Sequence, residues 1–379
     1  MSTARILALT AIANLALIIG LALVTAIVKV RRERKQKARE VELGLLRPVL
    51  LRYLATWEDG NAADLGETLI KHHARTTSFE EVVAGLLPKL RGADRSVLVD
   101  ILRRRGTVTE ACEDTRSWRT IRRYQAVELL GSAGVLEAVP FVSRLLDDQN
   151  AEIRLAAVRA LGRIGGLEAA GALLEHLDRE DARIPPHPVT MALLRIGTEA
   201  TEPLLIALTA DRVNVRTIAA EVLGVLGVMP AVGHLEHRLD TDLHAAVRVG
   251  AAHAVGRLGM PSSIPVLLQT LAREQNIDVL AAACTALGRI TDPSTIPALE
   301  RALHHPSPTV RIAAALALVL MGRAGLDRLW LIAQQDALGG DAAREVLARF
   351  TISTATPSST VPMPDQVVDL ASPVTAHAE

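Results

Sequence analysis

The feature that most constrains the fold is a short phrase, L-G-x-x-G, that recurs along the chain at a nearly fixed interval. Its second glycine falls in phase at Gly134, Gly165, Gly197, Gly227, Gly259 and Gly322, and Thr291 takes its place in one further unit. Successive positions are 30 to 32 residues apart. Self-similarity at such a period is typical of repeat architectures, in which each unit packs on its neighbours. The sequence therefore predicts about seven stacked units of about 31 residues.

We predict that each unit consists of two helices joined by a glycine-containing turn. We assign the whole L-G-x-x-G phrase to this turn. Nine residues after the position of the first glycine, which is Leu194 in the third unit, a proline occurs in four units, at Pro140, Pro203, Pro265 and Pro297. Proline is tolerated in the first turn of a helix, where its missing N–H has no partner, so it marks the start of the second helix. Aliphatic residues four apart, such as Leu267 and Leu271, predict one buried stripe on that helix.

The first helices are rich in Ala, in keeping with a chain that is 49% hydrophobic but only 2% aromatic. Small aliphatic side chains favour closely packed helices over sheet sandwiches. The third unit departs from this pattern, because Pro185, Pro186 and Pro188 fall where its first helix should lie. We expect these prolines to interrupt that helix and to produce a local bend.

An uncharged run from Ile6 to Val28 is the second strong feature. As a helix it is long enough to cross a hydrocarbon core of about 30 Å, so we predict a transmembrane anchor within residues 1–30. Seven Lys and Arg follow the run, whereas only Arg5 precedes it. The positive-inside rule then places the N-terminus outside and the C-terminal body in the cytoplasm. The alternative is a cleaved signal peptide, although such peptides have a shorter apolar core and carry their cations before it.

Two further membrane contacts are expected near this run. The basic juxtamembrane segment, residues 31–40, is suited to anionic lipid headgroups. Within the span, Asn14 and the small residues Ala16 and Gly20 could pack on another transmembrane helix.

From about residue 118 to 350 the repeats resemble the HEAT-repeat family of armadillo-like helical proteins, in its bacterial single-pass membrane-anchored type. The resemblance implies an all-α fold, a right-handed alpha-alpha superhelix preceded by one transmembrane helix. The family carries an Arg near the start of each first helix, and an Asp upstream of it could pair with that Arg in a ladder that joins adjacent units. The matching arginines are Arg123, Arg154, Arg216, Arg248 and Arg311, and the matching aspartates are Asp148, Asp211 and Asp242.

These features divide the chain into five parts. The anchor (1–30) and the juxtamembrane segment (31–40) precede a degenerate helical cap (41–117), which an array needs because its end exposes an apolar face. The HEAT-repeat solenoid follows (118–350). Residues 351–379 are rich in Ser, Thr and Pro and are expected to form a disordered tail.

A search for catalytic chemistry yields one candidate, a group of histidines at His234, His237, His244 and His253. His234 and His237 are three apart on a helix and could reach one metal ion. Deoxyhypusine hydroxylases, which are HEAT-like enzymes, carry His-Glu dipeptides at a di-iron site, and this sequence contains no such dipeptide. We predict that the chain is not an enzyme and binds no cofactor. The alternative is a HEAT-like lyase or metal-dependent hydroxylase that uses the region from His234 to His253.

Charge and surface residues indicate the kind of partner. The net charge is zero, but residues 1–40 carry eight Lys/Arg and two Glu, so the rest of the chain is mildly acidic. This argues against nucleic acid. Cys112 and Cys284 have no metal-ligand spacing and read as reduced helix residues. In the HEAT-repeat family the second helices line the concave side, and their outward residues here form a mixed set suited to a protein. These residues are Arg144, Glu175, His237, Gln269 and Arg301.

We therefore expect a membrane-anchored scaffold or adaptor on the cytoplasmic face of the cell membrane. Its partner would be a protein at or in that membrane, such as a polysaccharide glycosyltransferase, because single-pass HEAT-repeat proteins are sometimes associated with these enzymes.

Overall fold

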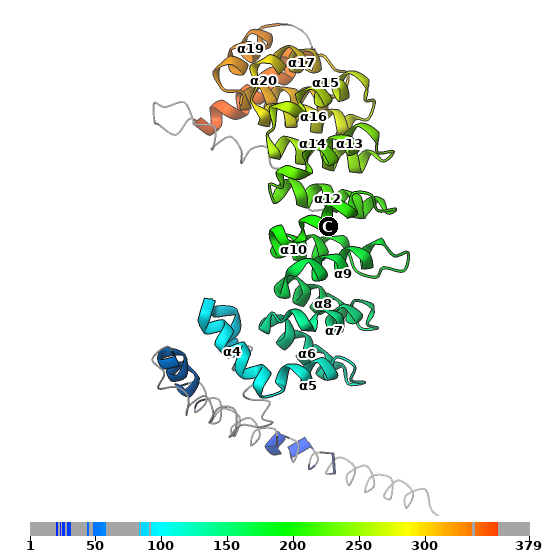
Figure 1. Cartoon of the computed structure of the whole chain (residues 1–379). Coiled ribbons are helices and arrows are strands. Elements are labelled where there is room, and N and C mark those ends of the chain that lie inside the picture. The colour runs from blue at the N-terminus through cyan, green and yellow to red at the C-terminus, as the bar shows by residue number, and fades with distance from the viewer. Residues whose placement is uncertain are drawn as a thin grey trace, which may run out of the picture. The chain divides into compact units, whose positions relative to one another are not determined.

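The computed structural model describes residues 92–335 and 338–354, together with parts of 20–31, 44–57 and 83–90 (Figure 1). Every regular element in these ranges is a helix, so the all-α prediction is confirmed. The chain divides into two compact units, residues 1–133 and 134–379. Most of the predicted anchor, the juxtamembrane segment, much of the cap and the tail beyond residue 354 lie outside the described residues. Within the described parts, no helix is both long and apolar enough to cross a bilayer.

After several partly described helical stretches before residue 87, the first unit contains a short 3-10 turn and three α-helices with continuous bounds. They are η2 (Leu87–Lys89), α4 (Gly92–Arg104), α5 (Thr107–Asp114) and α6 (Thr120–Ala133). Leu98 and Leu102 on α4 are fully buried. The guanidinium of Arg95 donates hydrogen bonds to the carbonyl oxygens of Ser132 and Ala133, at 3.2 and 3.3 Å. These bonds satisfy carbonyls at the end of α6, where the helix supplies no partner of its own.

The second unit is a solenoid of two helix layers, as the repeat predicted (Figure 1). The layer of first helices contains α8 (Ala151–Ile164), α10 (Pro186–Ile196), α12 (Val213–Val225), α14 (Ala245–Leu258), α16 (Ile277–Ile290) and α18 (Pro308–Leu320). The layer of second helices contains α7 (Val139–Ser143), α9 (Gly166–Asp178), α11 (Thr201–Ala207), α13 (Val232–Thr241), α15 (Ile264–Arg273) and α17 (Ile296–Ala302). The second helix of the last repeat is α19 (Arg323–Ala333), and one further helix, α20 (Leu338–Thr354), follows it.

Short 3-10 turns precede five of the second helices: η3 (Leu136–Ala138), η5 (Gly197–Ala200), η6 (Met229–Ala231), η7 (Pro261–Ser263) and η8 (Pro293–Thr295). A further turn, η4 (Arg144–Asp147), ends α7. Pro140, Pro265 and Pro297 lie at the second residue of α7, α15 and α17. The proline rule therefore located the start of these helices correctly.

The first glycine of the phrase does not belong to the turn, so this part of the prediction was wrong. It lies inside the first helix, where it touches the first helix of the next repeat. A Cβ atom at Gly256 would stand 2.5 Å from the Cα of Ala286, and one at Gly224 would stand 2.6 Å from the Cα of Ala254. Real Cβ atoms do not approach a backbone so closely, and only glycine permits this helix spacing.

The second glycine does belong to the turn, because the backbone at this position has a positive φ angle in every repeat. The φ angle is +66° at Gly259 and +57° at Thr291, and Thr291 is the one non-glycine residue with positive φ among the described residues. A left-handed backbone costs an L-residue roughly 1–2 kcal/mol, and more for a β-branched one.

The substitution Thr291→Gly is therefore expected to stabilise the protein by about 1 kcal/mol, after allowance for the greater chain entropy of glycine. Thr291 is exposed, so little packing is lost. The midpoint of urea unfolding, followed by circular dichroism, measures the effect. The reciprocal change Gly259→Thr should lower the midpoint, and a lower midpoint for Thr291→Gly would contradict the strain argument.

In the third repeat, the expectation that prolines interrupt the first helix was wrong. Helix α10 is continuous from Pro186 to Ile196, with Pro185 as its N-cap. The prolines lie in or before the first turn, where the missing N–H groups have no helical partner, so they shorten the helix instead of breaking it. Leu194 replaces the close-packing glycine in this unit, and α10 packs less extensively on α12 than α12 does on α14.

Candidate functional site

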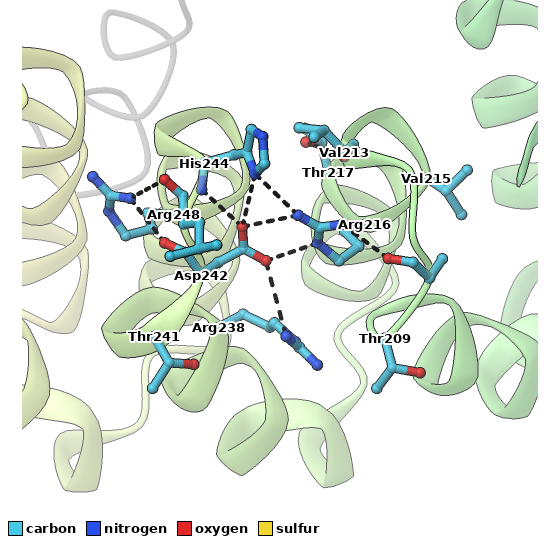
Figure 2. A network of polar contacts seen from close by, with 12 residues as sticks. Thr209, Val213, Val215, Arg216, Thr217, Arg238, Thr241, Asp242, His244 and Arg248 are labelled. Atoms are coloured by element: carbon cyan, nitrogen blue, oxygen red, sulfur yellow. Dashed lines mark hydrogen bonds and ion pairs between the residues drawn. The ribbon is translucent and has the colours of Figure 1, made fainter.

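The most elaborate polar cluster in the second unit is centred on Arg216 of α12 (Figure 2). Its Nη1 atom donates to the carbonyl oxygens of Ala210 and Asp211 in the preceding loop, at 2.9 and 2.8 Å. Its Nε and Nη2 atoms donate to the carboxylate of Asp242 in the next repeat, at 2.8 and 3.1 Å. The two side chains are only 10% and 2% exposed. The guanidinium of Arg216 thus binds both the loop that precedes α12 and the carboxylate of the following repeat.

The same arrangement recurs one repeat later. Arg248 donates through Nη1 to the carbonyl oxygens of Asp242 and Leu243, at 2.8 and 3.2 Å. Its Nε and Nη2 atoms bind the carboxylate of Glu274, at 2.7 and 3.1 Å. Arg154 and Arg311 also donate to the carbonyls of their own preceding loops. Arg123, in the first unit, does the same.

These contacts correct the predicted direction of the ladder. The sequence suggested that an Asp pairs with the Arg that follows it, whereas Asp242 binds Arg216 of the preceding repeat and offers only its backbone carbonyl to Arg248. The loop geometry explains the difference, because Arg216 and Arg248 each reach back over their own loop to its carbonyls and forward to the next carboxylate. Glu274 was missed, although it lies 32 residues after Asp242, in phase with the repeat.

This network lowers the pKa of both carboxylates, Asp242 and Glu274. Burial by itself raises the pKa of Asp242, but the hydrogen bonds from Arg216 and from the His244 N–H, with the attraction of Arg216 and Arg238, outweigh it and leave the pKa below its ordinary value. The pKa of Glu274 is lowered in the same way, since the bonds from Arg248 and from two backbone N–H groups outweigh its burial. Carboxylates held in this manner are structural ion-pair partners and not proton donors at neutral pH.

The four histidines of the metal candidate occupy different surroundings. His234 and His237 are exposed on α13. His244 lies beside the Arg216–Asp242 pair, with its Nδ1 atom 3.3 Å from Nη2 of Arg216. His253 is half-buried on α14, and burial together with the cations of Arg257 and Arg289 lowers its pKa. Within the described ranges, no three His, Cys, Asp or Glu side chains gather closely enough to hold a metal ion.

The remaining predicted residues are placed as follows. Arg144, Glu175, His237 and Arg301 are exposed, as a binding surface requires. Gln269 is half-buried, and its amide donates to Asp240 at 2.9 Å, so it joins α15 to α13. Asn14 and Ala16 lie outside the described residues, and Gly20 lies in a helical, exposed position.

Both cysteines are free and buried. Cys112 lies on α5 and Cys284 on α16. Burial raises the pKa of the Cys284 thiol to about 12. Such a thiol stays protonated at neutral pH and packs as a small apolar side chain.

An open groove of about 570 Å³ lies between α9 and α11, and sequence reasoning did not locate it. Its apolar surface includes Leu167 and Ile206, which are 49% and 66% exposed. Small residues widen it, since Gly171 stands at a position where four other units carry proline, and a Cβ at Gly171 would meet no atom within 4 Å. The lining residues are Leu167, Glu168, Gly171, Ala172, Leu174, Glu175, Asp178, Glu202, Pro203, Ile206, Ala207, Thr209, Ala210 and Val215.

The paired helices, the close contacts between first helices and the inter-repeat Arg–carboxylate bonds define a helical repeat protein. The family model for HEAT repeats matches residues 108–194, 201–276 and 264–348, which together make up more than half of the chain. The chain therefore belongs to the HEAT-repeat family.

Individual relatives are more distant. A HEAT repeat-containing taxis protein of Halobacterium salinarum is 30% identical over 164 residues, which cover 43% of this chain and 35% of the relative. The alignment thus spans about a third of that curated protein. Among solved structures, importin beta is 14% identical and matches with a TM-score of 0.42, over 72% of this chain and 45% of its own. Human deoxyhypusine hydroxylase is 19% identical and matches with a TM-score of 0.29, over 74% of this chain and 99% of its own.

Proposed function

We propose that this protein is a non-catalytic scaffold or adaptor whose layer of second helices binds a protein partner. The observation that carries the proposal is the groove between α9 and α11, where the large aliphatic side chains of Leu167 and Ile206 are exposed and line one hollow. Large exposed aliphatic side chains that line a hollow are a feature of interaction surfaces. The exposed residues Arg144 and Glu175 lie on or beside the same layer of helices and supply the polar surroundings that such interfaces have.

The proposal includes a membrane anchor. The uncharged run Ile6–Val28 and the seven cations after it support a single-pass protein whose body lies in the cytoplasm, with the basic segment on anionic lipid. Confinement to one membrane raises the effective concentration of the scaffold toward partners in the same membrane. A membrane enzyme, such as a glycosyltransferase that makes polysaccharide, is a partner of the right kind.

The rival proposal, an enzyme that uses the region from His234 to His253, has less support. His253 faces the cations Arg257 and Arg289, which oppose a bound metal cation. His244 is engaged with Arg216 and Asp242. These two histidines therefore belong to packing and ladder contacts, and only His234 and His237 would be left to bind a ligand.

The test compares three forms of the chain in its native cells after chemical cross-linking: the full chain, a form without residues 1–30, and the double variant His234→Ala/His237→Ala. Tagged protein is recovered from solubilised membranes, and its cross-linked partners are quantified by mass spectrometry. We expect the same partner with the full chain and the double-His variant, and its loss without residues 1–30. A partner that survives removal of the anchor, together with a stoichiometric metal that the double-His variant loses, would contradict the scaffold and favour the enzyme.

A further inference from the structure

The charged residues that line the groove between α9 and α11 are all acidic. They are Glu168, Glu175 and Asp178 of α9 and Glu202 of α11, and the groove lining contains no Lys, Arg or His. The rest of the lining is mainly aliphatic. We propose that this groove binds a basic amphipathic helix of a partner protein, with aliphatic side chains in the groove and Lys or Arg at its acidic rim. This inference rests on the proposed scaffold function and specifies the chemistry of its partner.

The rim carboxylates are available to such a partner. Glu168, Glu175 and Glu202 are exposed, and no described residue forms a hydrogen bond or an ion pair with them. Glu168 and Glu175 are seven residues apart on α9 and therefore lie on the same face of that helix. Asp178 accepts a hydrogen bond from the backbone N–H of Arg212, at 3.1 Å, and is fixed in place. Cations of a bound segment would thus meet three carboxylates, those of Glu168, Glu175 and Glu202, that lack a partner among the described residues.

The floor of the groove is hollow, so it suits a ligand with protruding side chains better than a ligand with a flat surface. Gly171, Ala172, Ala207 and Ala210 leave room between the two helices, and Ile206 stands beside that space. A helix that presents apolar residues at positions i, i+3 or i+4, and i+7 fills such a groove, as in other helix-in-groove complexes. Burial of the aliphatic contacts supplies affinity, whereas the charge complementarity supplies specificity and a faster association rate.

Other occupants fit the groove less well. Nucleic acids and anionic lipids are repelled by the acidic rim. A small polar ligand would require convergent donors, and the ionised side chains here only accept. The second hollow, between α15 and α17, has a different character, because its lining includes Arg301, His304 and His305.

The test uses the purified full chain and a fluorescein-labelled helical peptide of about 15 Leu and Lys residues, with Leu at the i, i+3, i+4 and i+7 positions. Fluorescence anisotropy measures its dissociation constant for the parent and for the variant Gly171→Leu, which adds an aliphatic side chain at a groove position where a Cβ meets no atom within 4 Å. The matched control is Gly233→Leu, at the same repeat position on α13, where a Cβ also meets no atom within 4 Å. We expect Gly171→Leu to weaken binding by about tenfold or more, and Gly233→Leu to leave it within about twofold.

Charge is tested separately. The variant Glu168→Gln/Glu175→Gln removes two rim charges with little change of shape and should also weaken binding, and its residual binding should depend less on salt than that of the parent. A peptide with Glu in place of Lys should not bind. A peptide of residues 29–39 of this chain serves as a competitor. If that peptide bound the groove and the Leu–Lys peptide did not, the proposal of a partner helix would be wrong, and the groove would instead bind this segment of the same chain.

The two proposals can fail separately. If Gly171→Leu and the rim variant bind the peptide as tightly as the parent, the groove assignment is wrong. If, in that case, cross-linking still recovers a partner that depends on residues 1–30, the scaffold function stands and its contact surface lies elsewhere. Loss of peptide binding in both groove variants but not in Gly233→Leu supports the inference.

Discussion

The variant Leu267→Asp is expected to lower the free energy of unfolding by about 3–5 kcal/mol. Leu267 lies on α15 with none of its surface exposed. A carboxylate there would be buried among aliphatic side chains, and α15 stacks on α13, α16 and α17, so the packing on either side of its repeat would be lost as well. Urea unfolding followed by circular dichroism measures the effect.

The control for Leu267→Asp is Arg301→Ala on α17. Arg301 is exposed, and its side chain has no hydrogen bond or ion pair within the described part of the chain. Its removal should change the unfolding free energy by less than about 0.5 kcal/mol. If Leu267→Asp had the same unfolding midpoint as the parent and Arg301→Ala lost much of its stability, the assignment of buried and exposed faces on the second helices would be wrong.

The second large effect is expected for Asp242→Ala, again about 3–5 kcal/mol. The change leaves the guanidinium of Arg216 nearly buried without its carboxylate and removes the acceptor of the His244 N–H. Replacement of both partners, in Arg216→Met/Asp242→Leu, should recover much of the loss, because the penalty comes from the unpaired charge. A double-mutant cycle on the unfolding free energies separates the two contributions.

A matched control for Asp242→Ala is available one repeat earlier. Asp211 occupies the same position of its repeat, but it is exposed and contributes only its backbone carbonyl to Arg216. Asp211→Ala should therefore cost less than about 0.5 kcal/mol. Similar losses for Asp211→Ala and Asp242→Ala would refute the inter-repeat direction of the ladder.

The same carboxylate predicts how stability depends on pH. The pKa of Asp242 is lower in the folded protein than its ordinary value near 3.8, so the unfolded chain binds the proton more readily. The stabilisation is complete above that ordinary value and is lost as the pH falls through the folded pKa. The parent should therefore lose more stability on acidification below about pH 4 than Asp242→Asn does.

The repeat predicted the two-layer fold because each phrase has a position that requires a left-handed backbone, and in four units a proline that can start the next helix follows it. The role of the first glycine was not visible in one unit, since close packing depends on Ala286 and its equivalents in the neighbouring helix. The same limit applies to the ladder. Arg216 was identified by its position, but its partner Asp242 lies 26 residues away and depends on how two repeats stack.

The groove was even less accessible from the sequence. Glu175 was selected because it faces outward on a second helix, but Leu167 and Ile206 belong to different repeats and form one surface only when α9 lies beside α11. A hint was present at Gly171, which replaces the usual proline and leaves space at that position. Space between helices cannot be read from the residues of either helix alone.

The most direct test of the account is site-specific photo-cross-linking from the full chain in its native cells. A photoreactive residue is placed at Ile206 or Glu175 in the groove, and at Arg257 on the exposed side of α14 as the comparison. The account predicts a discrete protein adduct from the two groove positions that disappears with Gly171→Leu, and no such adduct from Arg257. An adduct that forms only from Arg257, or one from the groove positions that is unchanged by Gly171→Leu, would contradict it.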